Sequence, residues 1–193
     1  MNDAVKNRIE EYLECYLSDK RKSHTYAVAL EAVNLARRYG ADQQKAELAA
    51  LFHDMYRGKP VEILDAMVRE FGLDPSYLGN SNLSHGKIAA KVMEQEYGIK
   101  DPDILNAVAY HTTGRAEMSL LEKIIYLADA IEPGRRYPGI SELRKLAYTS
   151  LNKACIKAMS RSIDYIKSRG LELDRDTLRA KNYLVEEERR SYE

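Results

Sequence analysis

Apolar residues recur along most of the chain every three or four positions, the spacing that lines one face of an α-helix. In the first such segment these positions are Val5, Ile9, Tyr12, Leu13 and Tyr16. Glycine, proline and short polar clusters separate the segments, as expected where helices end. The pattern predicts helices over residues 1–18, 24–39, 43–55, 60–71, 85–97, 102–111, 119–131, 141–169 and 174–190.

Local signals support several of these boundaries. Gly40 follows an apolar run and is a suitable helix stop, and Asp101 with Pro102 is a typical helix start. Residues 72–84 are rich in glycine, proline, asparagine and serine, so we expect a loop there. No stretch of useful length alternates apolar and polar residues as a strand does. We therefore predict an all-α protein, a helical bundle of roughly nine helices.

Size and charge narrow the class of protein. The length of 193 residues suits a single domain, residues 1–193, with one well-buried core. Lys and Arg total 30, as do Asp and Glu, so no net charge attracts nucleic acid or an anionic membrane. The start lacks the apolar segment of a secretory signal, and no apolar run approaches the ~20 residues of a membrane span. Cys15 and Cys155 are isolated, which is typical of reduced thiols, with one disulfide as the alternative. We expect a cytoplasmic protein.

The chain has four histidines, and each lies at a predicted helix end or loop–helix junction: His24, His53, His85 and His111. None occupies the middle of an apolar helix face, where a structural histidine would pack. Asp54 directly follows His53, so both side chains can reach one ion, or the carboxylate can bridge two. Imidazole with carboxylate suits iron, manganese, cobalt, nickel or zinc rather than calcium. The alternative interpretation is a histidine at a helix end beside a solvated aspartate.

The pattern of His24, His53-Asp54 and Asp129 resembles the HD-domain superfamily of all-helical, metal-dependent phosphohydrolases. It is most similar to the YqeK-type symmetrical bis(5'-nucleosyl)-tetraphosphatases, which split diadenosine tetraphosphate into two ADP. The His-Thr-Thr-Gly sequence at 111–114 and the Leu-Ala-Asp-x-Ile-Glu-Pro sequence at 127–133 are more specific than the His-Asp pair. The resemblance covers about residues 20–185 and is carried by residues 21–25, 51–54, 84–86, 110–115, 119–129 and 131–135.

The resemblance implies a ligand set and a reaction. It implies that an iron-type cation is bound by His24, His53, Asp54 and Asp129. His85 and His111 would hold a second metal or face the phosphates, which makes them, with Asp54, the expected catalytic residues. Asp54 would orient the attacking water or accept its proton. The metal's identity, and whether one or two cations bind, stay open.

Basic residues lie close to the proposed ligands in three places. They form the groups Lys20-Arg21-Lys22, Arg57 with Lys59, and Arg135-Arg136. Each group alone is ordinary surface, but three such groups together are better explained by a polyphosphate between them. We expect Arg21, Arg57 and Arg135 to bind substrate phosphates, together with His85 and His111. Many family members have lysine at the position of Arg57, and a guanidinium there keeps the positive charge.

We expect Tyr137, next to Arg135-Arg136, to stack on a base or ribose. The predicted partners are therefore diadenosine tetraphosphate and its product ADP, and the apolar helix faces leave a homodimer possible. Other activities of HD domains are alternatives, namely hydrolysis of deoxynucleotides, nucleoside monophosphates or cyclic nucleotides, or oxygenase chemistry. Outside the enzymes, the chain could be a regulator that binds metal and ADP without turnover.

Overall fold

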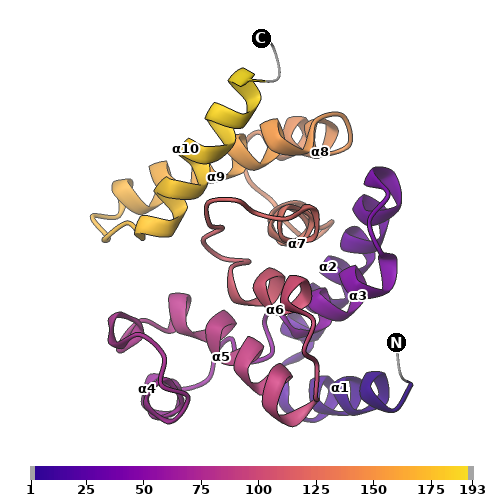
Figure 1. Ribbon diagram of the computed structural model, residues 1–193, viewed down its shortest axis with the longest axis vertical. Helices are drawn as coiled ribbons and strands as arrows, with labels where there is room; N and C mark the ends of the chain where they lie inside the picture. Colours follow the sequence, from indigo (N-terminus) through magenta and orange to yellow (C-terminus); the bar gives the residue numbers. More distant parts are fainter. Residues whose placement is uncertain (1–2, 191–193) are drawn as a thin grey trace.

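The computed structural model describes residues 3–190, and it is all-helical over that range, without a strand (Figure 1). Within these residues, ten α-helices and one short 3-10 turn follow one another. They are α1 (Asp3–Tyr16), α2 (Asp19–Tyr39), α3 (Gln43–Phe52), α4 (Val61–Glu70), η1 (Pro75–Tyr77), α5 (Ser81–Glu96), α6 (Pro102–Ala109), α7 (Leu120–Ile131), α8 (Ile140–Ala147), α9 (Leu151–Ser168) and α10 (Arg175–Arg190). None of these helices combines the length and the apolar character needed to cross a membrane.

Helix α7 lies at the centre of the molecule. In Figure 1 it is viewed nearly end-on, with α2 and α3 on one side, α6 below it and α9 above it. Its residues from Leu121 to Ala128 are buried without interruption, which is the pattern of a helix covered on all sides. Ser119 and Glu122 start the helix with a reciprocal capping box. The buried helix therefore delivers Asp129, the next residue, to the middle of the bundle.

The buried apolar side chains form two clusters. The large core joins α1, α2, α3 and α5–α10 around α7. A smaller cluster between α4 and α5 consists of Leu64, Val68, Ile88 and Val92. Helix α5 contributes to both, so its position is fixed from two sides.

The all-α prediction is confirmed, and so are most helix centres, but two helix starts were predicted too late. Helix α2 begins at Asp19 because the Ser18 side chain caps it by accepting from the Arg21 N–H. Helix α5 begins at Ser81 because the Asn80 side chain accepts from the Leu83 N–H. Both first turns consist mainly of polar residues, so their composition resembles that of a loop.

Two further boundaries differ from the prediction. The segment predicted as one helix over 141–169 is divided between α8 and α9 by a turn at 148–150, so the described residues hold ten α-helices rather than nine. Helix α3 ends at Phe52 rather than near residue 55. The start at Asp101-Pro102 and the stop at Gly40, with φ of 72°, are confirmed. The first two residues of the predicted helix 1–18 lie outside the described range.

Candidate metal and phosphate site

All four histidines and the two predicted ligand aspartates meet in one place, although they come from five parts of the chain. The elements that carry them are α2 for His24, the end of α3 for His53 and Asp54, α5 for His85, the turn after α6 for His111, and α7 for Asp129. The sequence thus identified side chains that are brought together by the fold.

Each imidazole is held at its Nδ1 atom by an acceptor outside the cluster. A neutral ring that donates from Nδ1 carries its lone pair on Nε2, the atom available to a metal. The four acceptors are the carbonyls of Ala50 for His53 (2.6 Å), Ser81 for His85 (3.0 Å) and Val108 for His111 (2.8 Å), and the carboxylate of Glu132 for His24 (3.3 Å). All four Nε2 atoms therefore point into the cluster, where Nε2 of His111 also lies 3.1 Å from the Thr112 hydroxyl.

The Asp54 carboxylate lies between two pairs of these nitrogens. Its Oδ2 atom is 3.6 Å from Nε2 of His24 and 3.7 Å from Nε2 of His53. Its Oδ1 atom is 3.2 Å from Nε2 of His85 and 3.7 Å from Nε2 of His111. Within the pairs the Nε2 atoms are 3.4 Å and 3.0 Å apart, respectively. Lone pairs so close repel each other unless a proton or cation lies between them, so this donor set fits a metal.

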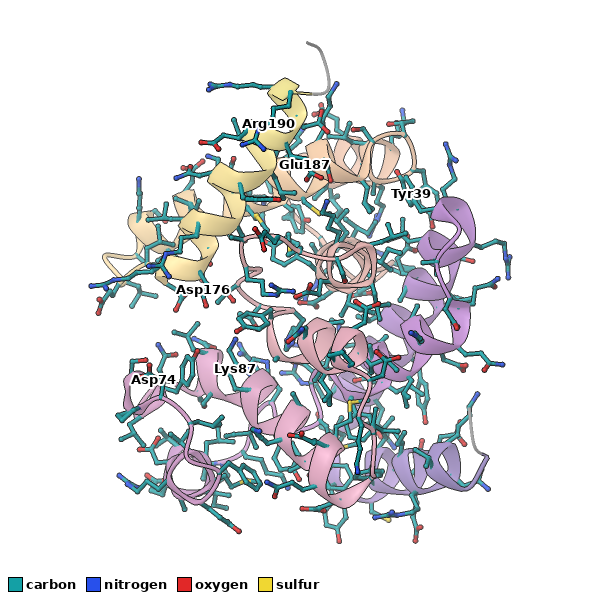
Figure 2. The ribbon with its side chains drawn as sticks, viewed as in Figure 1. Tyr39, Asp74, Lys87, Asp176, Glu187 and Arg190 are labelled. Atoms are coloured by element: carbon teal, nitrogen blue, oxygen red, sulfur yellow. The ribbon has the colours of Figure 1, made fainter. Side chains whose placement is uncertain are left out.

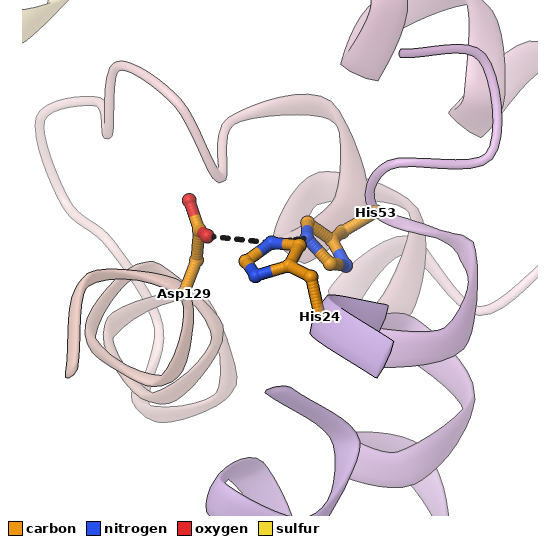
Figure 3. A group of neighbouring side chains, drawn as sticks. All are labelled: His24, His53 and Asp129. Atoms are coloured by element: carbon orange, nitrogen blue, oxygen red, sulfur yellow. Dashed lines mark hydrogen bonds and ion pairs between the residues drawn. The ribbon is translucent and has the colours of Figure 1, made fainter. Parts of the chain in front are cut away.

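Asp129 completes the first of these groups. Figure 3 shows His24, His53 and Asp129 pointing toward one another, and Nε2 of His24 is 3.1 Å from Oδ1 of Asp129. One ligand atom from each of these three residues lies within 4.8 Å of the others, and the same holds for His53, Asp54 and His111. The two groups share His53 and adjoin at Asp54, so the arrangement can hold one cation or two.

At His53, His85, Asp54 and Asp129, burial and charge favour the protonation states that a metal requires, whereas at His24 the Asp129 carboxylate outweighs burial and raises the pKa of the imidazole. His53 is completely buried, and burial lowers its pKa to about 4, while burial also lowers the pKa of His85. Burial acts against ionisation of Asp54 and Asp129, but the surrounding imidazoles, and Arg135 beside Asp129, outweigh it and lower both carboxyl pKa values. Neutral imidazoles beside ionised carboxylates are the ligand form of both side chains.

The cluster opens into a cavity of about 980 Å³ whose wall is rich in cations. The positively charged side chains lining it are Lys20, Arg21, Arg57, Arg135, Arg136 and Arg161. Of the predicted basic groups, Lys22 instead pairs with acidic side chains on the surface, and Lys59 lies over two tyrosine rings of α1.

Three of the arginines contact the ligand residues themselves. Nη1 of Arg21 donates to Oδ2 of Asp54 at 2.5 Å, and Arg135 pairs with the Asp129 carboxylate while its Nε donates to the Asp129 carbonyl at 2.8 Å. Nη1 of Arg57 is 3.4 Å from the His85 ring. An anion bound at the cluster would therefore meet guanidinium groups on several sides.

Two residues of the site were not predicted from the sequence. Glu132 is buried, positions His24 through Nδ1, and accepts a short hydrogen bond from the Gly134 N–H. A Cβ atom on Gly134 would lie 2.9 Å from the Glu132 carboxylate, so a larger residue there would displace this carboxylate. Glu132 belongs to the 131–135 stretch that carries the family resemblance, and this was a usable signal.

The second residue not predicted from the sequence is Arg161 of α9. It lines the cavity, and its guanidinium carbon lies 3.5 Å from the centroid of the Tyr137 ring. No motif near Arg161 in the sequence points to the site. Tyr137 does line the cavity, and its hydroxyl donates to the carbonyl of Ala130 at 2.7 Å.

Comparison with known proteins agrees with this geometry. A model of the HD domain family matches residues 21–134. A symmetrical bis(5'-nucleosyl)-tetraphosphatase of Bacillus subtilis is 41% identical over 180 residues, covering 91% of this chain and 97% of its own length. One of Halalkalibacterium halodurans is 42% identical over 176 residues, covering 90% and 94%.

A solved structure shows the same fold. It is a predicted HD superfamily hydrolase involved in NAD metabolism from Clostridium acetobutylicum, with a TM-score of 0.90 and 41% sequence identity, covering 94% of this chain and 97% of that one. The family match includes the His53-Asp54 pair and ends five residues after Asp129. The chain therefore belongs to the HD-domain family, in the branch that contains the symmetrical bis(5'-nucleosyl)-tetraphosphatases.

Proposed function

We propose that this protein hydrolyses diadenosine tetraphosphate symmetrically into two ADP, the activity for which its relatives in Bacillus subtilis and Halalkalibacterium halodurans are named. The observation that carries the proposal is the position of the histidine–aspartate cluster within a cavity lined by six cationic side chains. The charge of a polyphosphate is opposite to that of the side chains lining this cavity. The family match supports the reaction, and the geometry supports the assignment of residues.

In this proposal His24, His53, Asp54 and Asp129 are metal ligands, and His85 with His111 form a second ligand pair across Asp54. A bound divalent cation supplies Lewis acidity, which brings the pKa of a coordinated water near neutrality and neutralises phosphate charge. We propose iron as the bound metal, and the same ligands also suit manganese, cobalt, nickel or zinc. The placement of Asp54 between the two histidine pairs supports a pair of cations.

The side chains around the cluster then have separate tasks. Asp54 lies against all four imidazoles, where its carboxylate can orient the attacking water and accept its proton. Three arginines neutralise the phosphate oxygens and hold the polyphosphate in line for attack by the water; they are Arg21, Arg57 and Arg135. The bond that breaks joins the two central phosphates, so ADP is the leaving group and the water oxygen ends on the other ADP. No covalent enzyme intermediate is needed.

Product analysis tests the proposed reaction. Purified protein supplied with Fe²⁺, Co²⁺ or Mn²⁺ is incubated with diadenosine tetraphosphate in ¹⁸O-labelled water, and the nucleotides are separated and weighed. We expect ADP as the sole product, with one labelled oxygen on the terminal phosphate of half of the molecules. ATP with AMP would show asymmetric cleavage and overturn the proposal. Stable binding of metal and ADP without turnover of any nucleotide would instead identify a regulator.

Metal counting tests the second ligand pair. If two cations bind, His85→Ala should halve the metal content of the protein, whereas a phosphate-facing His85 would leave it unchanged. Elemental analysis of the purified wild-type protein identifies the metal in the same experiment. His85 and His111 contact only one oxygen of Asp54, so their removal should spare the cation held by His24, His53 and Asp129.

A further inference from the structure

Arg161 differs from the other arginines that line the cavity. Arg21 and Arg135 pair with ligand carboxylates, and Arg136 donates to backbone carbonyls. Among the described residues, Arg161 has no hydrogen-bond or ion-pair partner, and its one recorded contact is the stack on the Tyr137 ring. Its guanidinium donors and its outer face are therefore available to a ligand.

The stack is firmly placed relative to the metal cluster. The Tyr137 hydroxyl donates to the carbonyl of Ala130, the residue that follows the ligand Asp129 in α7. The Tyr137 ring also packs against the large core. Arg161 approaches from α9, which itself packs on α7. A group bound to this stack would therefore keep a constant distance from the reacting phosphates.

The chemistry of the stack suits a nucleobase better than a phosphate. A guanidinium is planar and weakly hydrated, so it stacks readily on aromatic faces, including those of bases. The arginines that touch the metal ligands already surround the phosphate position, whereas Arg161 touches none of those ligands. A dinucleoside polyphosphate has a base at each end of its charged chain, away from the phosphate that reacts.

We propose that Arg161, held on the ring of Tyr137, is the platform on which the base of one ADP half of the substrate stacks. The inference rests on the proposed function, since it needs a nucleotide in this cavity. It modifies the prediction for Tyr137, because Arg161 covers one face of that ring. On that face the tyrosine acts by holding the guanidinium flat. Stacking of this kind accepts any base, so guanine-containing substrates should bind as well.

Calorimetric titration of the metal-loaded protein separates the base from the phosphates. The two ligands are ADP and inorganic pyrophosphate, which has the phosphates without the nucleoside. For Arg161→Ala we expect the Kd of ADP to rise about tenfold, as loss of one base stack implies, with the Kd of pyrophosphate unchanged. Arg161→Lys keeps the positive charge but lacks the planar guanidinium, so this variant should bind ADP as poorly as the alanine variant.

Arg169→Ala is the matched control. Arg169 lies over Tyr165 at 5.5 Å on the same helix, and neither residue lines the cavity. Its removal should change neither Kd. An equal loss of pyrophosphate binding in Arg161→Ala, or recovery of ADP binding in Arg161→Lys, would assign Arg161 to the phosphates and overturn the proposal. An unchanged Kd for ADP would overturn it as well.

The two proposals fail in different ways. Binding of ADP is measured without turnover, so it tests Arg161 even if diadenosine tetraphosphate proves not to be the substrate. Where the wild type is active, Arg161→Ala should raise the KM for diadenosine tetraphosphate and leave kcat and the ADP product unchanged. A fall in kcat at constant KM would also contradict the assignment, because the platform does not touch the reacting atoms.

Discussion

Replacing Lys87 by methionine should stabilise the protein at neutral pH, because this lysine buries an ammonium group without a hydrogen-bond partner. Lys87 belongs to α5 and is only 9% exposed. Its Nζ atom lies 3.0 Å from the centroid of the Tyr110 ring and 5.8 Å from that of Tyr77. Figure 2 shows it on the side of α5 that faces Asp176 at the start of α10.

The magnitude follows from the pKa of Lys87. Burial lowers this pKa from its ordinary value of 10.5 to about 8, against the opposing effect of Asp176 and Asp174. The difference is equivalent to about 3 kcal/mol against folding while the amine is charged. The cation–π contact with the Tyr110 ring offsets about 1 kcal/mol of this cost. Lys87→Met should therefore raise the free energy of unfolding by about 2 kcal/mol at pH 7.

The pH dependence has a definite sign. The unfolded chain keeps the Lys87 proton up to about pH 10.5, whereas the folded protein releases it near pH 8. Between these values the unfolded state binds more protons, so the stability of the wild type rises with pH. The advantage of Lys87→Met should therefore shrink from pH 8 upward and vanish near pH 10.5.

Urea denaturation at pH 7, 8.5 and 10, with metal either removed or saturating throughout, measures this difference. Lys91→Met is the control, since Lys91 is partly exposed on the same helix and pairs with Glu94 at 3.0 Å. The reasoning is refuted if Lys87→Met is less stable than the wild type at pH 7. It is refuted equally if the difference between them does not change with pH.

Four other substitutions test the site. His53→Ala and Asp129→Ala should each lose metal and activity together, and stoichiometric metal in both variants would show that the ligand set is wrong. Arg57→Ala should keep its metal and bind substrate more weakly, whereas unchanged kinetics would place Arg57 away from the substrate. Gly86→Ala places a Cβ atom 3.0 Å from the His111 ring and 2.9 Å from a backbone carbonyl. Gly86→Ala should lower the free energy of unfolding, measured by urea denaturation, by about 1–3 kcal/mol, and it should also lower the metal content. An unchanged free energy of unfolding would mean that the packing around Gly86 adjusts.

Much of the fold could be predicted because burial is periodic. The centre of α7 was recognisable as an apolar run, and its position among five other helices explains why nearly every residue in it is apolar. The starts of α2 and α5 were missed for the opposite reason. Their first turns carry polar residues that face the cavity or solvent, so apolar spacing says nothing about them. Only the caps Ser18 and Asn80 mark these starts.

Contacts between residues far apart in the sequence could not be predicted, for a different reason. Arg161 is far from Tyr137 in the sequence, and neither its type nor its neighbours indicate that α9 passes the cavity. Lys87 likewise gave no signal, because its burial depends on Tyr110 and on the approach of α10. Pairings of this kind arise from packing between helices, and one sequence does not specify them.

The four histidines do meet in one cluster, although the positions in their helices differ in part from those expected. His53 and His111 do lie at helix ends, and there the carbonyls of the last turn have no partner within the helix. Ala50 and Val108 supply such carbonyls, so one bond both satisfies the helix end and fixes Nε2 toward the cluster.

His24 and His85 were also expected at helix starts, but both lie in the second turn of their helices. Their Nδ1 atoms find other acceptors, a buried carboxylate for His24 and the carbonyl one turn back for His85. All four rings thus reach the same result, with Nδ1 held by an acceptor and Nε2 directed into the cluster. The common feature of the four histidines is an acceptor for Nδ1, and a helix end is only one way to provide it.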